Sequence, residues 1–200
     1  SAMTSAQPLG FSDPFSGSKG WVDRYGDVIV SQFNSAQMMA DKWKLSRAKM
    51  EAFALRSHNR ALNAIDKGYF DREIVPLNGV MMDETPRITS LEKMAELQPI
   101  EEGGSITAAV SSQTCDGASA ILLVSEEALK RYNLTPRARI VHMSVRGADP
   151  IWMLTAPIPA TEHALKKSGM SIHDIDLVEI NEAFAPVPMA WLAETGFDPE

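Results

Sequence analysis

The chain has 200 residues, of which 44% are apolar and 22% charged, a composition typical of a folded protein rather than a disordered one. The formal net charge is −7 and Lys and Arg are scattered, which argues against a nucleic-acid partner, although a local basic pocket for a phosphorylated ligand stays open. The longest apolar runs fall far short of the roughly 18 residues that a membrane-spanning helix needs, and residues 1–5 lack a signal-peptide pattern. A single cysteine excludes an internal disulfide, and we expect a cytoplasmic protein with no membrane partner.

Helices are predicted mainly from caps and from apolar residues at helical spacing. Residues 1 to about 33, rich in Gly, Pro and Ser, predict a long surface loop. A first helix is predicted over 36–43, and a second runs from the N-cap Ser46 to a stop at Gly68. A capping-box pattern at 89–92 opens a short helix. Similar signals predict helices over 125–132 with the cap Ser125, over 159–167 with the stop Gly169, and over 183–194 with Pro186 and Pro188 in the first turns.

Apolar, β-branched runs between these helices predict extended strands. Strand-like segments are expected at 73–77, 106–110, 118–124, 138–145 and 176–180. A polar hinge, 111–117, separates two of them. The order of strand 138–145, helix 159–167 and strand 176–180 resembles a βαβ unit, so the predicted fold class is α/β.

The segment 174–185 is the most informative part of the chain. A short buried strand ends there and a helix follows, with Asn181 and Glu182 at the junction. An amide and a carboxylate beside a helix N-terminus are well placed to hold a ligand. Asn at such a junction also commonly caps the helix, so both interpretations stay open.

The run Asn-Glu-Ala-Phe-Ala at 181–185 resembles the thiolase family, which carries this segment intact. The segments 46–47, 70–76, 90–94, 116–118, 135–141 and 156–160 also look like thiolase segments, in thiolase order and spacing. The resemblance weakens only before about residue 30. It implies a partial thiolase fold with the loop domain at 1–104, the end of the N-terminal half at 105–133 and the start of the C-terminal half at 134–200.

The resemblance also implies an activity. Thiolases are acyl-CoA C-acyltransferases of fatty-acid and lipid metabolism, including β-oxidation, that cleave 3-ketoacyl-CoA with CoA or condense acetyl-CoA through an acyl-cysteine. The nucleophilic cysteine and the downstream His and Cys motifs do not occur in these 200 residues. We therefore expect a central thiolase piece that is inactive alone. The alternatives are a non-catalytic module that binds CoA or a lipid thioester, and a structural or interaction domain.

Several residues take roles from the resemblance. Asn181 would hold the oxyanion-hole water. Ser112 would hydrogen-bond the pantetheine arm of CoA, in a tunnel that Ala108 also lines, and Arg87 would meet a CoA phosphate. Alternatively, Ser112 is a turn residue that bonds its own backbone, and Arg87 is a solvated loop charge. The family usually has Gly where Gln113 stands, and this departure questions how closely a ligand can approach.

Two apolar residues, Met153 and Phe184, correspond to positions that line the acyl and pantetheine pocket, although plain core packing is an equal alternative. Cys115 is expected not to be the nucleophile, because nothing basic lies near it in the sequence.

Expected ligands and partners follow from the same resemblance. The four histidines show no metal-ligand spacing, so we expect no metal and no permanently bound cofactor, with CoA as a substrate. The expected partners are the remaining thiolase segments and, for the intact protein, identical copies in a dimer or tetramer. Apolar faces at Trp191, Leu192 and Phe197 are expected to be exposed.

Overall fold

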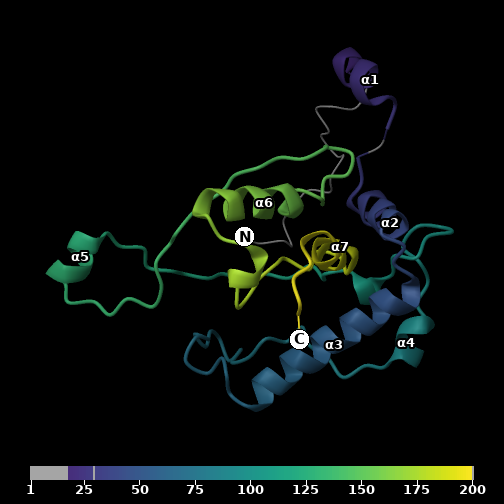
Figure 1. The fold of residues 1–200 in the computed structure, drawn as a ribbon. Coiled ribbons are helices and arrows are strands. Elements are labelled where there is room, and N and C mark those ends of the chain that lie inside the picture. Colours follow the sequence, from purple (N-terminus) through teal and green to yellow (C-terminus); the bar gives the residue numbers. More distant parts are fainter. Residues whose placement is uncertain (1–17, 29, 200) are drawn as a thin grey trace.

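The computed structural model describes residues 18–28 and 30–199, and the remainder of the predicted N-terminal loop lies outside these residues. Figure 1 shows a cluster of helices from which a long loop, carrying one short helix, projects to one side. The α-helices are α1 (Lys19–Tyr25), α2 (Gln32–Lys42), α3 (Arg47–Asp66), α4 (Leu91–Ala95), α5 (Glu126–Arg131), α6 (Pro157–Ser168) and α7 (Pro186–Thr195), and the 3₁₀ helices are η2 (Ala108–Val110) and η3 (Ile172–Asp174).

Local caps place most helix ends where the sequence predicts them. The Ser46 hydroxyl accepts the Lys49 N–H at 3.3 Å, so α3 begins directly after it. Beyond its other end Gly68 has φ +65°, and a Cβ there would lie 2.6 Å from the carboxylate of Asp71, which explains a glycine. The predicted caps of α5 by Ser125 and of α6 by a left-handed Gly169 are also confirmed.

Several helix predictions need correction. Helix α2 begins at Gln32, inside the predicted loop, rather than at residue 36. Residues 19–25 form α1, so this part of the predicted loop is helical, and Ser90 rather than the residue before it caps α4. Helix α7 begins at Pro186, later than predicted. The reason is tertiary, because the Ala183 carbonyl and the Ala185 N–H are both bonded to the segment 110–112. The helix then starts on a proline, whose missing N–H costs nothing in a first turn.

The core lies where α2, α3 and α7 meet. Met39 and Met50 are fully buried there, together with apolar residues of α7 and of η2. Polar side chains join the helices at their rims, since the Trp191 indole donates to the Thr161 hydroxyl at 2.8 Å. Trp191 is therefore buried, and the expectation that it would be exposed is wrong.

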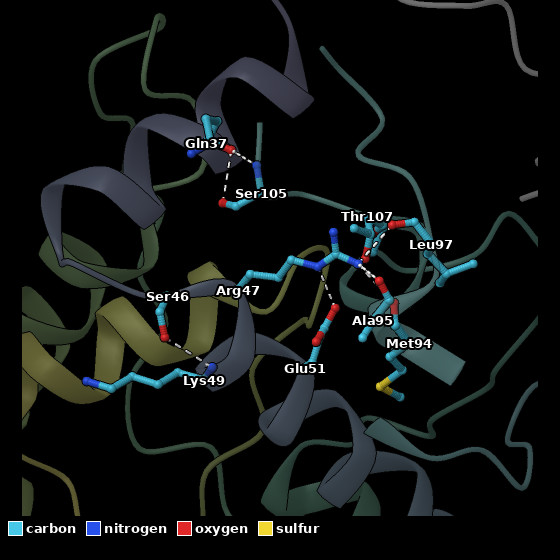
Figure 2. A network of polar contacts seen from close by, with 11 residues as sticks. Gln37, Ser46, Arg47, Lys49, Glu51, Met94, Ala95, Leu97, Ser105 and Thr107 are labelled. Atoms are coloured by element: carbon cyan, nitrogen blue, oxygen red, sulfur yellow. Dashed lines mark hydrogen bonds and ion pairs between the residues drawn. The ribbon is translucent and has the colours of Figure 1, made fainter. Parts of the chain in front are cut away.

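Arg47 fixes the position of α4 on α3, as Figure 2 shows. Its Nε donates to the buried Glu51 carboxylate at 2.7 Å. Its Nη2 donates to the carbonyls of Met94, Ala95 and Leu97 at 2.8 to 3.0 Å. These carbonyls lie at and just beyond the C-terminus of α4, and that of Met94 also accepts a backbone N–H, from Leu97 at 3.1 Å. One guanidinium therefore contacts a buried carboxylate and a helix end together.

The predicted strands do not form ladders among the described residues. Only isolated bridges occur there, at Leu77–Val80, Pro99–Thr107 and Ser111–Phe184. Part of the segment predicted as strand 106–110 is instead η2. Apolar side chains of the other segments face solvent: Leu122 is 77% exposed, Val145 91% and Leu177 89%. A strand needs a neighbour to accept and donate its backbone hydrogen bonds, and the rest of the described chain does not provide one.

Candidate functional site

A cavity of about 540 Å³ lies between α3, α4, the loop 83–89 and the segment 108–113. Helix α3 forms one wall, and the segment 108–113 forms the wall nearest α7. The polar and charged side chains that line it are Ser57, His58, Asp83, Thr85, Arg87, Thr89, Lys93, Ser111, Ser112, Gln113 and Glu182.

Backbone hydrogen bonds hold the segment 108–113 against the start of α7. The Ser112 N–H donates to the Ala183 carbonyl, and the Ala185 N–H donates to the Val110 carbonyl, each at 2.9 Å. The Ser111 hydroxyl also donates back to the Thr107 carbonyl at 2.8 Å. These contacts bring the hinge and the Asn-Glu-Ala-Phe-Ala segment, far apart in the sequence, to the same cavity.

Glu182 crosses from the α7 side of the cavity to α3. The Ser57 hydroxyl donates to the Glu182 carboxylate at 2.8 Å. Asn181, next to it in the chain, is exposed and lies outside the cavity lining. The structure therefore places the glutamate, rather than the asparagine, in the cavity wall.

Arg87 is held at two points on opposite sides of the cavity. Its backbone N–H donates to Nδ1 of His58 on α3 at 3.4 Å, and its guanidinium Nη2 donates to the Gln113 side-chain carbonyl. Burial lowers the pKa of His58 from its ordinary value of 6.5, and the Arg87 charge lowers it further, while Glu182 opposes the shift. His58 is thus neutral near pH 7, as an accepting Nδ1 requires.

The structure brings together three of the six predicted site residues, because Arg87, Ala108 and Ser112 all line this cavity. Phe184 is buried in the core, with its ring edge-on to Phe33 at 5.7 Å between centroids. Met153 is half-buried directly after a turn, has φ +27° and is not a lining residue. Cys115 is exposed and also lies outside the lining.

Sequence reasoning missed the cavity residues of α3. Ser57 and His58 lie one turn after Phe53 and Ala54, and one turn before Ala61, all of which line the cavity. Helical spacing was the available signal, because it places these two polar residues on the stripe of α3 that also carries its apolar side chains. A polar pair within such a stripe indicates that this part of the helix faces a cavity.

The cavity wall carries charges of both signs. Arg87 and Lys93 supply positive charge, and Asp83 and Glu182 supply carboxylates. Across residues 18–28 and 30–199 the structure holds no cluster of three or more His, Cys, Asp or Glu suited to a metal. Within the same residues, no helix is long and apolar enough to cross a membrane.

Comparison with known families identifies the class. Residues 20–127 match the family model of the thiolase N-terminal domain, and residues 134–200 match that of the thiolase C-terminal domain. The chain therefore belongs to the thiolase family, and the partial thiolase fold predicted from the sequence is confirmed.

Individual relatives agree with this assignment. The chain is 56% identical over 203 residues to the steroid 3-ketoacyl-CoA thiolase FadA6 of Mycobacterium tuberculosis, covering 100% of this chain and 50% of FadA6. It is 42% identical over 166 residues to the human mitochondrial 3-ketoacyl-CoA thiolase, covering 78% of this chain and 42% of that protein. The crystal structure of the human enzyme in complex with CoA matches with a TM-score of 0.80, covering 82% of this chain and 43% of that one. The chain spans about half the length of the curated relatives it matches.

Proposed function

We propose that this chain forms part of an acyl-CoA C-acyltransferase that cleaves 3-ketoacyl-CoA with CoA, or condenses acetyl-CoA, through an acyl-cysteine. The observation that carries the proposal is the single cavity that collects Arg87, Ala108 and Ser112 in a chain of the thiolase family. Its support is the match to a thiolase solved in complex with CoA. The proposed organisation is the loop domain at 1–104 and two partial halves at 105–133 and 134–200.

In this proposal each residue has a defined part. The Ser112 hydroxyl bonds the pantetheine arm beside Ala108, and the Arg87 guanidinium pairs with a CoA phosphate, for which its planar fork is well suited. Asn181, exposed beside Glu182 and outside the lining, holds the water of the oxyanion hole in the whole enzyme. Met153 and Phe184, which lie outside the lining, would contact the acyl group in the whole enzyme.

The proposed substrates are CoA and 3-ketoacyl thioesters of fatty-acid metabolism. We propose that the protein has no permanently bound cofactor and that it is cytoplasmic.

A second function, a CoA-binding module without catalysis, is favoured by one observation on these residues. The single cysteine, Cys115, is exposed and outside the cavity, so the described cavity has no thiol nucleophile.

The first experiment measures CoA binding by titration calorimetry on the 200-residue chain. We expect saturable binding that weakens about tenfold in Ser112→Ala, since a hydrogen bond to the ligand is lost. Thr114→Ala, exposed in the same hinge and outside the lining, is the matched control and should bind like the original. No binding by any of the three proteins contradicts both functions.

The second experiment separates the enzyme from the binding module. We expect no thiolysis of acetoacetyl-CoA by the chain alone, because the covalent nucleophile is not in its cavity. Thiolysis gained on adding the other segments of a thiolase supports the enzyme, whereas CoA binding without such a gain supports the module. Turnover by the chain alone that is lost in Cys115→Ser would refute the expectation that Cys115 is not the nucleophile.

The proposed partners are the remaining thiolase segments and further copies of the chain. The exposed apolar segments 118–124 and 138–145 support this, because unpaired extended backbone with apolar side chains drives association. Sedimentation velocity should show association that decreases in Ile121→Lys, a residue 84% exposed, but not in Thr114→Lys. Equal association in both variants would show that the segment 118–124 does not form the contact.

A further inference from the structure

We propose that Gln113 is a positioning residue that holds the Arg87 guanidinium ready for a phosphate group of the ligand. This inference rests on the proposed function, since it takes CoA as the ligand of the cavity. The role also explains why Gln113 stands where the family usually has glycine, because glycine has no side chain to accept a hydrogen bond from Arg87.

The chemistry of the contact favours this role over an ordinary surface pair. Gln113 accepts one hydrogen bond, from Nη2, and an arginine carries five N–H donors, so the other donors stay available. An amide carbonyl is neutral. It therefore orients the guanidinium without compensating its positive charge, which a carboxylate in the same place would do.

The cavity carboxylates are engaged elsewhere. Asp83 accepts from the backbone N–H and hydroxyl of Thr85 at 2.9 and 2.7 Å, and Glu182 accepts from Ser57. In the part of the chain that the structure describes, no carboxylate pairs with the Arg87 guanidinium. Among these described residues the Arg87 guanidinium therefore has no direct ion-pair partner at the cavity wall, which leaves its donors available to an anionic ligand.

Both ends of Arg87 are attached to rigid parts of the fold. Its backbone is bonded to His58 on α3, and Gln113 belongs to the hinge whose neighbouring Ser112 N–H is bonded to the Ala183 carbonyl. A long side chain held in this way has fewer rotamers to lose when a ligand binds. The expected benefit is tighter binding through pre-organisation rather than through a new ligand contact.

The test is a double-mutant cycle for CoA affinity in the 200-residue chain, with Arg87→Ala, Gln113→Ala and the double variant, and with far-ultraviolet dichroism to check that each stays folded. We expect Arg87→Ala to weaken CoA binding about tenfold and Gln113→Ala about threefold, both at low salt. In the Arg87→Ala background, Gln113→Ala should have no further effect, because its partner is already gone. We expect the dependence of affinity on salt to flatten in Arg87→Ala, and to a smaller degree in Gln113→Ala.

The outcomes separate the inference from the function on which it rests. Fully additive losses, or a Gln113→Ala variant that binds CoA as tightly as the original, overturn the positioning role while leaving CoA binding intact. Tighter binding in Gln113→Ala overturns it as well, since the side chain would then obstruct the ligand. Failure of the original chain to bind CoA overturns the proposed function itself, and Thr114→Ala again serves as the unaffected control.

Discussion

The helical region formed by α2, α3 and α7 and the open region 115–148 both contain large apolar side chains, but only the first buries them. In the first, Met50 is fully buried, while in the second Leu122 is 77% exposed. Figure 1 shows the open region as a long excursion interrupted only by α5. A helix satisfies its own backbone and presents one apolar stripe for packing, whereas a strand requires a neighbour before either its backbone or its side chains can be buried.

The largest expected effect contrasts two apolar truncations. Met50→Ala should lower the free energy of unfolding by about 2 to 5 kcal/mol, because it leaves a cavity among packed helices. Leu122→Ala should change it by less than about 0.5 kcal/mol, since its side chain already faces solvent. Urea unfolding followed by far-ultraviolet dichroism measures both, and similar losses in the two variants would show that the open region is packed in solution.

Next in size is a contrast between two arginines. Arg47→Ala should cost about 2 kcal/mol, because the buried Glu51 carboxylate and three carbonyls lose the hydrogen bonds that the guanidinium donates. Arg137, which lies 3.6 Å from Glu73 with both side chains exposed, should cost less than about 0.5 kcal/mol when replaced by Ala. The same unfolding measurement decides. If the Arg137 variant lost as much as the Arg47 variant, the open region would have to be anchored through that pair.

A smaller effect compares two equal caps. The hydroxyls of Ser46 and Ser125 each accept a backbone N–H three residues later, at 3.3 and 3.1 Å. Ser46→Ala should lower global stability by about 1 kcal/mol, because α3 is part of the core. Ser125→Ala should leave global stability unchanged and only increase amide hydrogen exchange in α5. A global loss from Ser125→Ala would show that α5 folds cooperatively with the core.

The smallest effect concerns pH and the cavity wall. Because burial lowers the folded-state pKa of His58 below 6.5, the unfolded chain takes up the proton first. The associated stability is present above about pH 6.5 and is lost as the pH falls through the folded-state pKa. His58→Gln should therefore show a smaller fall in Tm between pH 7.5 and pH 5 than the original chain, by calorimetry. His173→Gln, at an exposed position, is the matched control. If Tm fell as much with pH in His58→Gln as in the original chain, the lowered pKa of His58 would be contradicted.

Much of the helical structure was predictable because its signals are local. The caps Ser46 and Ser125 and the stop Gly169 act within one turn of their own helix, so the sequence places those ends without reference to the rest of the fold. The strand predictions over 118–124 and 138–145 also rest on local signals. They were wrong, because these segments pair with no other strand in the described residues and pairing depends on a second segment.

The candidate site divides in the same way. The sequence by itself determined the family, through the segment 181–185, and it singled out Arg87 and Ser112 as candidates. Only the tertiary structure decided that Arg87 meets Gln113 and that Ser57 meets Glu182, a residue 125 positions away. Caps and motifs depend on residues that are neighbours in the sequence. A cavity wall is made by side chains that meet only after the helices have packed, so no local pattern specifies which of them will face one another.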